Sequence, residues 1–140
     1  MRPGNANRLR LTFQKRERLC SETAIAELFR LRQQFFCFPF RCFYQFRPAN
    51  GEDDVNQLVI SVSKRNFKHA VDRNRVKRLI REAYRLHHRE HLDPVLKADG
   101  QRVRFCLSYA TSEILPYKFI QDKIIEVLKR LTKVEQSKDS

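Results

Sequence analysis

Apolar residues recur along this chain at two spacings, one typical of helices and one typical of strands. Ser21 is a good N-cap residue, and the apolar residues after it lie three or four positions apart. This pattern predicts a short helix from Ser21 to about Arg32. Its apolar stripe consists of Ile25, Leu28 and Phe29.

Residues 35–46, FFCFPFRCFYQF, alternate in the manner of a strand. We expect one face of this strand to join the core: Phe36, Phe38, Phe40, Cys42, Tyr44 and Phe46. The other face combines aromatic rings with a cation: Phe35, Cys37, Pro39, Arg41, Phe43 and Gln45. An aromatic ring beside a cation, such as Phe43 beside Arg41, suits stacking on the bases of a single-stranded nucleic acid. Burial under the first helix is the alternative; we expect it for Phe35, and for Phe43 both interpretations stay open.

Residues 47–56 are polar and contain turn-forming residues, so they predict a hairpin loop with residues 57–63 as the return strand. The inward-facing residues of this strand are Leu58, Ile60 and Val62. A helix then follows Asp72, which is a suitable N-cap, and Pro94 ends it.

Residues 102–110 predict another strand, and a last amphipathic helix starts near Pro116. The core side of the strand consists of Val103, Phe105, Leu107 and Tyr109. The buried stripe of the helix consists of Ile120, Ile124, Val127, Leu128 and Leu131. These elements predict a single α+β domain, a small central sheet packed by helices, in the order α-β-β-β-α-β-α. We expect the domain to span residues 15–132, between a mobile basic N-terminus (1–14) and a frayed tail (133–140).

The composition favours a folded domain with a polyanionic partner. Of the 140 residues, 41% are hydrophobic and 11 are Phe, which excludes a disordered basic tail. The net charge of +13 means that the excess Lys and Arg side chains repel one another, and a bound polyanion reduces this repulsion. We expect nucleic acid as the partner, because no segment has the pattern of a basic amphipathic membrane anchor.

The cellular compartment is predicted from targeting signals and cysteines. The N-terminus is positively charged but has no apolar run behind it, so it lacks the pattern of a signal peptide. The longest apolar run, FFCFPF, is too short to cross a bilayer. Four cysteines show no zinc or redox spacing: Cys20, Cys37, Cys42 and Cys106. We expect buried reduced thiols in a cytoplasmic protein without a membrane partner.

The helix after Asp72 opens with the basic sequence DRNRVKRLIRE. At about 100° per residue, its apolar side consists of Val76, Leu79, Ile80, Ala83 and His87. Its other side is polar and basic: Asn74, Lys77, Arg78, Arg81, Arg85 and Arg89, with Arg73 and Arg75 at the flanks. Clustered cations weaken a helix start, whereas an ordinary solvated face mixes charges of both signs. We therefore predict a phosphate-binding surface, which Lys64, Arg65 and Lys68 extend into the preceding loop.

Two other clusters could suggest metal-dependent chemistry. His87 and His91 lie four residues apart but lack the order of a zincin and a convincing third ligand, so we expect a structural role for His87. Glu52, Asp53 and Asp54 are adjacent acids of the kind that bind metals in nucleases, but in a loop we expect a solvated turn. We predict neither a catalytic residue nor a dedicated metal site in the protein.

The segment SVSKRNFKHAVDRNRVKRLIREAYR resembles the signature of the protein component of bacterial ribonuclease P. In that family a strand ending in a Ser-Val-Ser-Lys type sequence leads to a helix that bears Arg-Asn-Arg-x-Lys-Arg. The matching residues here are Arg73, Asn74, Arg75, Lys77 and Arg78. FQKRERLCSETAIAELF resembles the basic lead-in and first helix, and FPFRCFYQF the first strand. The sequence departs from the family at Ile25, where an aromatic is common, and in RLRQQ, which lacks the expected glycine.

The resemblance implies the protein subunit of a ribonucleoprotein that removes the 5′ leader from precursor tRNA. The catalytic RNA, with bound Mg²⁺, does the chemistry, while the protein, expected to be a monomer, binds this RNA and the leader. The resemblance also implies a left-handed crossover between two parallel strands around the basic helix, against the general right-handed rule.

The resemblance implies two sets of contacts with RNA. The leader cleft between the sheet and the first helix would be lined by Ile25, Phe29 and Phe43, beside Arg41. The RNA-binding residues would be Lys64, Arg65, Lys68, Arg73, Asn74, Arg75, Lys77, Arg78, Arg81 and Arg85.

Two other classes of protein share parts of this pattern. A basic ribosomal or RNA-chaperone protein shares the charge and layout, but not the ordered sequence of the basic helix. A helix-turn-helix DNA reader needs a second helix just before the basic one, where residues 57–63 predict a strand.

Overall fold

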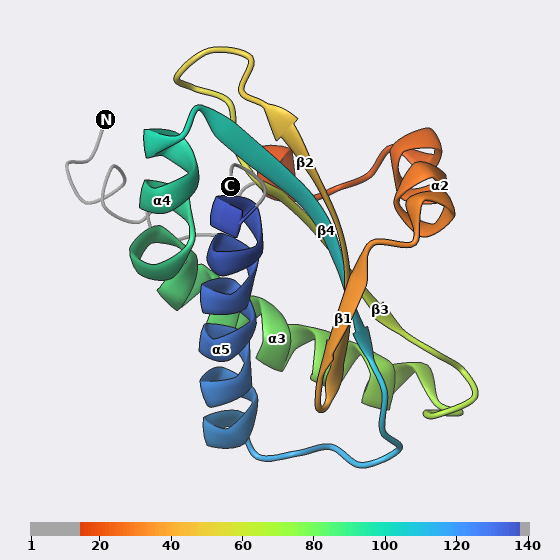
Figure 1. Cartoon of the computed structure of the whole chain (residues 1–140). Coiled ribbons are helices and arrows are strands. Elements are labelled where there is room, and N and C mark those ends of the chain that lie inside the picture. The colour runs from red at the N-terminus through yellow and green to blue at the C-terminus, as the bar shows by residue number, and fades with distance from the viewer. Residues whose placement is uncertain (1–14, 138–140) are drawn as a thin grey trace, which may run out of the picture.

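The computed structural model describes residues 15–137, in which helices cover both faces of a four-stranded sheet (Figure 1). The elements are η1 (Lys15–Glu17), α2 (Glu22–Leu31), β1 (Gln34–Cys37), β2 (Phe40–Pro48), β3 (Gln57–Val62), α3 (Ala70–His91), α4 (Asp93–Ala98), β4 (Gln101–Tyr109) and α5 (Tyr117–Ser137). This is the predicted order with two short elements added, η1 and α4. Residues 1–14, predicted to be mobile, lie outside the described residues. Helix α5 continues through residues 133–137, where the sequence predicts the start of a frayed tail.

The strand order is β1-β2-β4-β3, so the predicted hairpin between β2 and β3 is wrong. Strand β4 lies between them, antiparallel to β2 and parallel to β3. The central position suits β4 because side chains on both of its faces are buried, Phe105 on one and Cys106 on the other, whereas β3 exposes Ser61. The predicted parallel pairing of β3 with β4 is confirmed, and the left-handed crossover stays a prediction.

The run at residues 35–46 forms two strands, because a turn at Phe38 and Pro39 divides it into β1 and β2. Cys37 stands opposite Phe40 in the antiparallel pair, so the alternation restarts after the turn. The predicted core face is therefore right in β2, where Phe40 and Cys42 are buried and Tyr44 and Phe46 pack against the core. It is wrong before the turn: Phe36 and Phe38 are 45% and 46% exposed, and the buried residues are Phe35 and Cys37.

The main core lies between the sheet and helices α3, α4 and α5 (Figure 1). All the predicted core residues of β4 and α5 are buried, as are Leu58 and Val62 of β3, while Ile60 is half-buried. Each buried Leu or Ile of α5 contributes about 1.5–3 kcal/mol, so this stripe holds the helix on the sheet. Within residues 15–137, no helix is long and apolar enough to cross a membrane.

Helix α3 begins at Ala70, so Asp72 lies in its first turn and is not the N-cap as predicted. Its buried stripe passes through residues 76, 80, 83, 84 and 88. The buried histidine is therefore His88 rather than the predicted His87, which lies at the border of the stripe. His88 stacks on Tyr84 with ring centroids 4.6 Å apart, and its Nδ1 lies 2.7 Å from a carboxylate oxygen of Asp93.

Helix α2 covers the other face of the sheet and begins as predicted. The side chain of Ser21 accepts a hydrogen bond from the Ala24 amide at 3.2 Å, which caps the helix. Leu28 is fully buried against a small second core: Leu19, Ala24 and Cys106.

The four cysteines are free thiols, three of them buried as predicted. Cys20 is exposed, so the prediction of burial is wrong for this residue. Burial raises the pKa of Cys106 to about 12 and contributes to the rise of the Cys37 pKa to about 11. The buried thiols therefore stay protonated and act as small apolar side chains.

Candidate nucleic-acid interface

Side chains on the α2 face of the sheet form rows that run across the strands. In one row, Phe43, Cys106 and Val59 stand opposite one another in β2, β4 and β3 and pack beneath α2. The next row is the open row: Phe36, Arg41, Ser108 and Ser61. Three of its members are exposed and Ser108 is half-buried. The fold thus leaves one polar and aromatic row accessible beside α2.

The predicted cleft residues of α2 and β2 come together next to this row. The rings of Phe29 and Phe43 meet at 4.7 Å between centroids with an interplanar angle of 61°, an edge-to-face contact. Phe29 is 43% exposed, whereas Phe43 and Ile25 are half-buried against the second core. Phe43 is therefore partly packed beneath α2 and partly accessible for stacking, so each of the two interpretations holds for part of its ring.

Arg41 lies in the open row together with an aromatic residue that the sequence pattern assigned to the core. Its guanidinium lies 5.5 Å from the ring centroid of Phe36 and donates a hydrogen bond of 3.1 Å to Gln34. An unbroken alternation through Pro39 predicts a core position for Phe36, whereas the turn at Phe38 and Pro39 places it on the α2 face. The proline was the signal, since it interrupts pairing within a strand.

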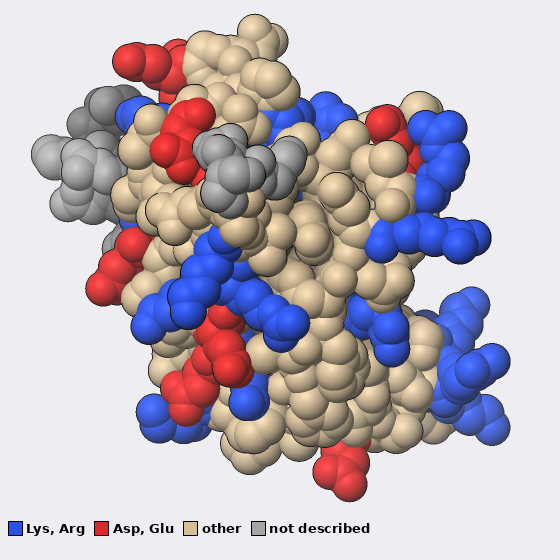
Figure 2. Space-filling view, viewed as in Figure 1, with Lys and Arg blue, Asp and Glu red and all other residues tan. Residues whose placement is uncertain are grey.

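The predicted bases of the loop after β3 follow the Ser61 end of the open row. Lys64, Arg65 and Lys68 are exposed. Arg73 folds back onto this loop and donates to the carbonyls of Phe67 at 2.8 Å and Lys68 at 3.1 Å. Figure 2 shows Lys and Arg side chains gathered over the end of β3 and the start of α3. Arg73 thus orders a loop whose other cations face solvent.

The predicted bases of α3 differ in their surroundings. Asn74, Arg75, Arg78 and Arg81 are exposed, and Lys77 is half-buried. Arg81 also lines a small pocket with Arg18 beside edge strand β3. Arg85 donates a hydrogen bond of 3.1 Å to Glu82, and this contact lowers the pKa of Glu82 and raises that of Arg85. Arg85 is therefore partly neutralised, while Arg75, Arg78 and Arg81 present their charge to solvent.

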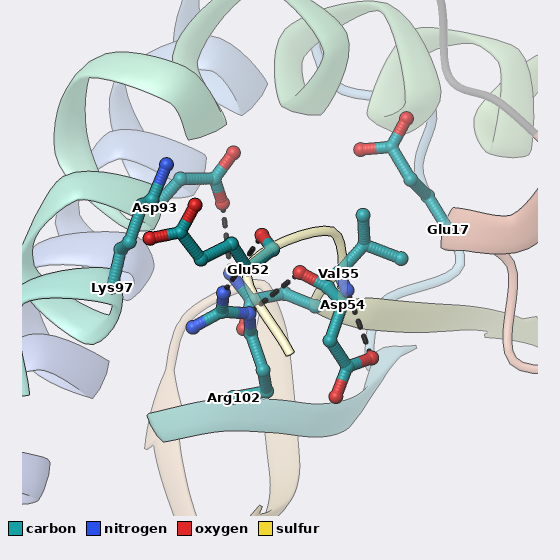
Figure 3. Close-up of a pocket in the computed structure, with 8 residues that line it drawn as sticks. Glu17, Glu52, Asp54, Val55, Asp93, Lys97 and Arg102 are labelled. Atoms are coloured by element: carbon teal, nitrogen blue, oxygen red, sulfur yellow. Dashed lines mark hydrogen bonds between the residues drawn. The ribbon is translucent and has the colours of Figure 1, made fainter. Parts of the chain in front are cut away.

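Two acids of the loop after β2, Glu52 and Asp54, line a pocket together with Asp93 and Arg102 (Figure 3). Asp54 accepts hydrogen bonds from Arg47 at 2.9 Å and from the Asn50 amide at 2.8 Å, which hold the pKa of its carboxyl well below the ordinary range. Buried Arg102 donates to the carbonyl of Asp54 at 2.6 Å. The expectation of a solvated turn without fixed geometry is wrong for Asp54, because these cations clamp it.

In α3, Glu90 lies beside His87 and His91, a possible third ligand that the sequence spacing did not suggest. Ligand atoms of His87, Glu90 and His91 lie within 4.8 Å of one another on one side of the helix. Both ring nitrogens of His87 are shielded from solvent and make no hydrogen bond. The structural role of His87 stays a prediction.

A family model for ribonuclease P matches residues 13–132, which include all the predicted site residues. The chain belongs to the ribonuclease P protein family. Over 72 residues it is 40% identical to the ribonuclease P protein component of Porphyromonas gingivalis, covering 51% of this chain and 52% of that protein. Over 77 residues it is 42% identical to that of Clostridium botulinum, covering 55% and 63%. The aligned part thus spans about half to two thirds of these curated family members.

Solved structures of the family share the fold. The RNase P protein of Staphylococcus aureus superposes with a TM-score of 0.58 at 23% identity, covering 84% of this chain and 96% of that one. The RNase P protein from Thermotoga maritima gives a TM-score of 0.59 at 22% identity, covering 81% and 96%.

Proposed function

We propose that this protein is the protein subunit of ribonuclease P and assists removal of the 5′ leader from precursor tRNA. The observation that carries the proposal is the open row beside α2, which leads into the basic loop and helix within a chain of this family. Single-stranded RNA is gripped by aromatic faces and by cations along its backbone, and this surface offers both.

The two kinds of side chain support a division of labour. Phe29, Phe43 and Arg41, on α2 and β2, would hold the unpaired leader, because stacking on aromatic rings tolerates any base sequence. The exposed bases of α3 and of the loop before it would bind phosphates of the catalytic RNA, since arginine pairs well with phosphate oxygens.

The cleavage chemistry falls to the RNA and its Mg²⁺ in this proposal. Asp54 and Asp93 are engaged with Arg47, Asn56 and His88, so we assign them structural roles. The protein would contribute cations that screen repulsion between the catalytic RNA and the precursor, and so lower the Mg²⁺ concentration that the reaction needs. We also propose that the protein acts as a monomer in the cytoplasm, where precursor tRNA is made.

Reconstitution tests the proposal. Nuclease-free protein is combined with a bacterial ribonuclease P RNA and a precursor tRNA at low Mg²⁺, and release of the leader is measured. We expect cleavage by the combined particle, little by the RNA alone and none by the protein alone. Robust cleavage by the protein without RNA would contradict the proposal.

A matched pair of variants separates specific binding from net charge. Arg78→Ala removes an exposed cation from the basic face of α3, whereas Lys129→Ala removes one from α5. We expect only Arg78→Ala to weaken stimulation of cleavage. A general RNA chaperone, the alternative function, would bind unrelated structured RNAs as well as ribonuclease P RNA and would not restore cleavage.

A further inference from the structure

Three exposed phenylalanines lie next to one another at the β1–β2 turn and the start of α5. Phe36, Phe38 and Phe119, which we call the phenylalanine patch, are 45%, 46% and 36% exposed. The ring centroid of Phe38 lies 6.4 Å from that of Phe36 and 6.3 Å from that of Phe119. The patch thus joins residues that are far apart in sequence.

Exposure of this patch needs a reason, because full burial of one such ring would contribute about 1.5–3 kcal/mol. Contiguous apolar surface on a folded domain usually marks a binding site. Cations lie over the rings at both ends: Arg41 over Phe36 and Lys123 over Phe119, each 5.5 Å from the ring centroid. The acids near this end of α5 are paired: Glu126 accepts hydrogen bonds from Lys123 at 3.3 Å and from the thiol of Cys37, and Asp122 lies 3.6 Å from Lys118. Rings flanked by cations match the chemistry of single-stranded RNA.

The patch continues the open row. Phe36 belongs to both and stands opposite Arg41, which lies two residues before Phe43 on the same face of β2. Accessible aromatic side chains therefore run from Phe29 and Phe43 past Arg41 to the turn and then to α5. One extended strand of RNA can follow this course, with bases on the rings and phosphates near the cations.

The strand order determines which end of the RNA strand would lie at the phenylalanine patch. The basic loop and α3 lie beside β3, whereas the patch lies at β1, the opposite edge of the sheet. The leader nucleotides nearest the cleavage site must remain close to the catalytic RNA, which the basic helix is proposed to bind. The patch is then the part of the protein that more distant nucleotides reach.

We propose that the phenylalanine patch binds leader nucleotides distal to the cleavage site, as an extension of the proposed leader surface. The proposal rests on the proposed function and adds a substrate preference: precursors with long leaders bind more tightly than those with short ones. Stacking of distal leader bases on Phe38 and Phe119 would account for this difference in affinity.

The test compares reconstituted particles on precursors whose leaders have about 4 or about 12 nucleotides, within the range that one single-strand binding site covers. We expect Phe38→Ala and Phe119→Ala each to weaken binding of the long-leader precursor about fivefold or more and to leave the short-leader precursor unchanged. Phe38→Tyr, which keeps a stacking ring, should retain wild-type affinity. Leu86→Ala removes an equally exposed apolar side chain from α3 and serves as the matched control.

Three results would overturn the inference. The first is an unchanged affinity for the long-leader precursor in both Phe38→Ala and Phe119→Ala. The second is an equal loss of affinity for the long-leader and short-leader precursors. The patch could also mediate contact between protein copies, which sedimentation would reveal as self-association of the wild type that Phe38→Ala abolishes. Failure of the proposed function is distinguishable, because the wild-type particle would then show no preference for leader-bearing over leaderless tRNA.

Discussion

Phe29 and Phe43 touch each other edge to face, yet the fold gives them different shares of packing and exposure. Phe29 exposes 43% of its surface, so its ring is free on one side to meet a base. Phe43 is half-buried against Leu28 and Cys106 of the second core. A change at Phe43 therefore alters both the stability of the domain and its surface.

We expect Phe29→Ala to weaken binding of leader-bearing precursor by about 1–3 kcal/mol, the contribution of one stacking ring. Its free energy of unfolding should change little. Phe43→Ala should weaken the same binding and also lower the free energy of unfolding, by less than the about 3–5 kcal/mol of a fully buried Phe. Equilibrium binding of leader-bearing and leaderless tRNA, together with denaturant unfolding, measures both effects. A loss of the full core value at Phe43 would show that its ring has no role in gripping RNA.

The ionisation of Asp54 should make the stability of the domain depend on pH. Contact with Arg47 holds its pKa in the folded state below the ordinary value of 3.8 that applies to the unfolded chain. The folded state thus keeps the charged form while the unfolded chain binds a proton, so the contribution is complete above pH 3.8 and is lost as pH falls through the folded pKa. We expect Asp54→Asn to reduce the free energy of unfolding at neutral pH by about 1–3 kcal/mol. Below about pH 3.8 the difference in the free energy of unfolding between Asp54→Asn and wild type should shrink. A constant difference down to pH 2 would contradict the role assigned to Asp54.

At the scale of elements, α3 combines a buried stripe with bases that serve two purposes. Arg73 donates to two carbonyls of the preceding loop, whereas Arg75 is exposed one residue beyond Asn74. Cations in the first turns weaken the helix start, so we attribute their presence there to the proposed RNA binding rather than to stability. Arg73 is the exception, because it also holds the loop.

Substitution of the α3 arginines should separate these roles. Arg75→Ala and Arg81→Ala should leave the free energy of unfolding within about half a kcal/mol of wild type, because both side chains are exposed. Each should lower the salt dependence of binding to the catalytic RNA by close to one counterion. Arg73→Ala should weaken binding and also lower Tm, since it frees the loop carbonyls. Affinity losses that simply follow Tm in all three variants would identify the basic face as structural.

At the scale of the whole molecule, the net charge of +13 opposes folding through self-repulsion. The ion pairs in the described part of the chain, such as Arg47 with Asp54, act in the other direction. Most of these pairs lie at the surface, where each contributes about 1 kcal/mol or less. Repulsion among the excess cations should therefore dominate the response to salt.

We expect Tm to rise by a few degrees between about 0.05 M and 0.5 M NaCl, because the Debye length shortens and screens the excess cations. A polyanion such as single-stranded RNA should produce a larger rise at low salt. Differential scanning calorimetry measures both. A Tm that falls with added NaCl would mean that the ion pairs outweigh the net charge.

Local residue pattern and total charge were enough to predict several features of this protein. The stripe of α5, the core side of β4 and the cap at Ser21 follow from residue spacing and side-chain chemistry, which act over a few neighbours. The phosphate-binding character of residues 64–85 was predicted in the same way, because cations there far outnumber the acids Asp72 and Glu82, and it stays a prediction. The family sequence in α3 connected that surface to ribonuclease P.

Tertiary structure alone decided which segments became neighbours. The hairpin expected after β2 gave way to β4, since a strand buried on both faces is most stable in the middle of the sheet. The turn at Pro39 changed the side on which Phe36 lies, and the packing of α5 brought Phe119 beside Phe38. Such choices depend on competition between distant segments for the same buried surface, which residue spacing along one segment does not record.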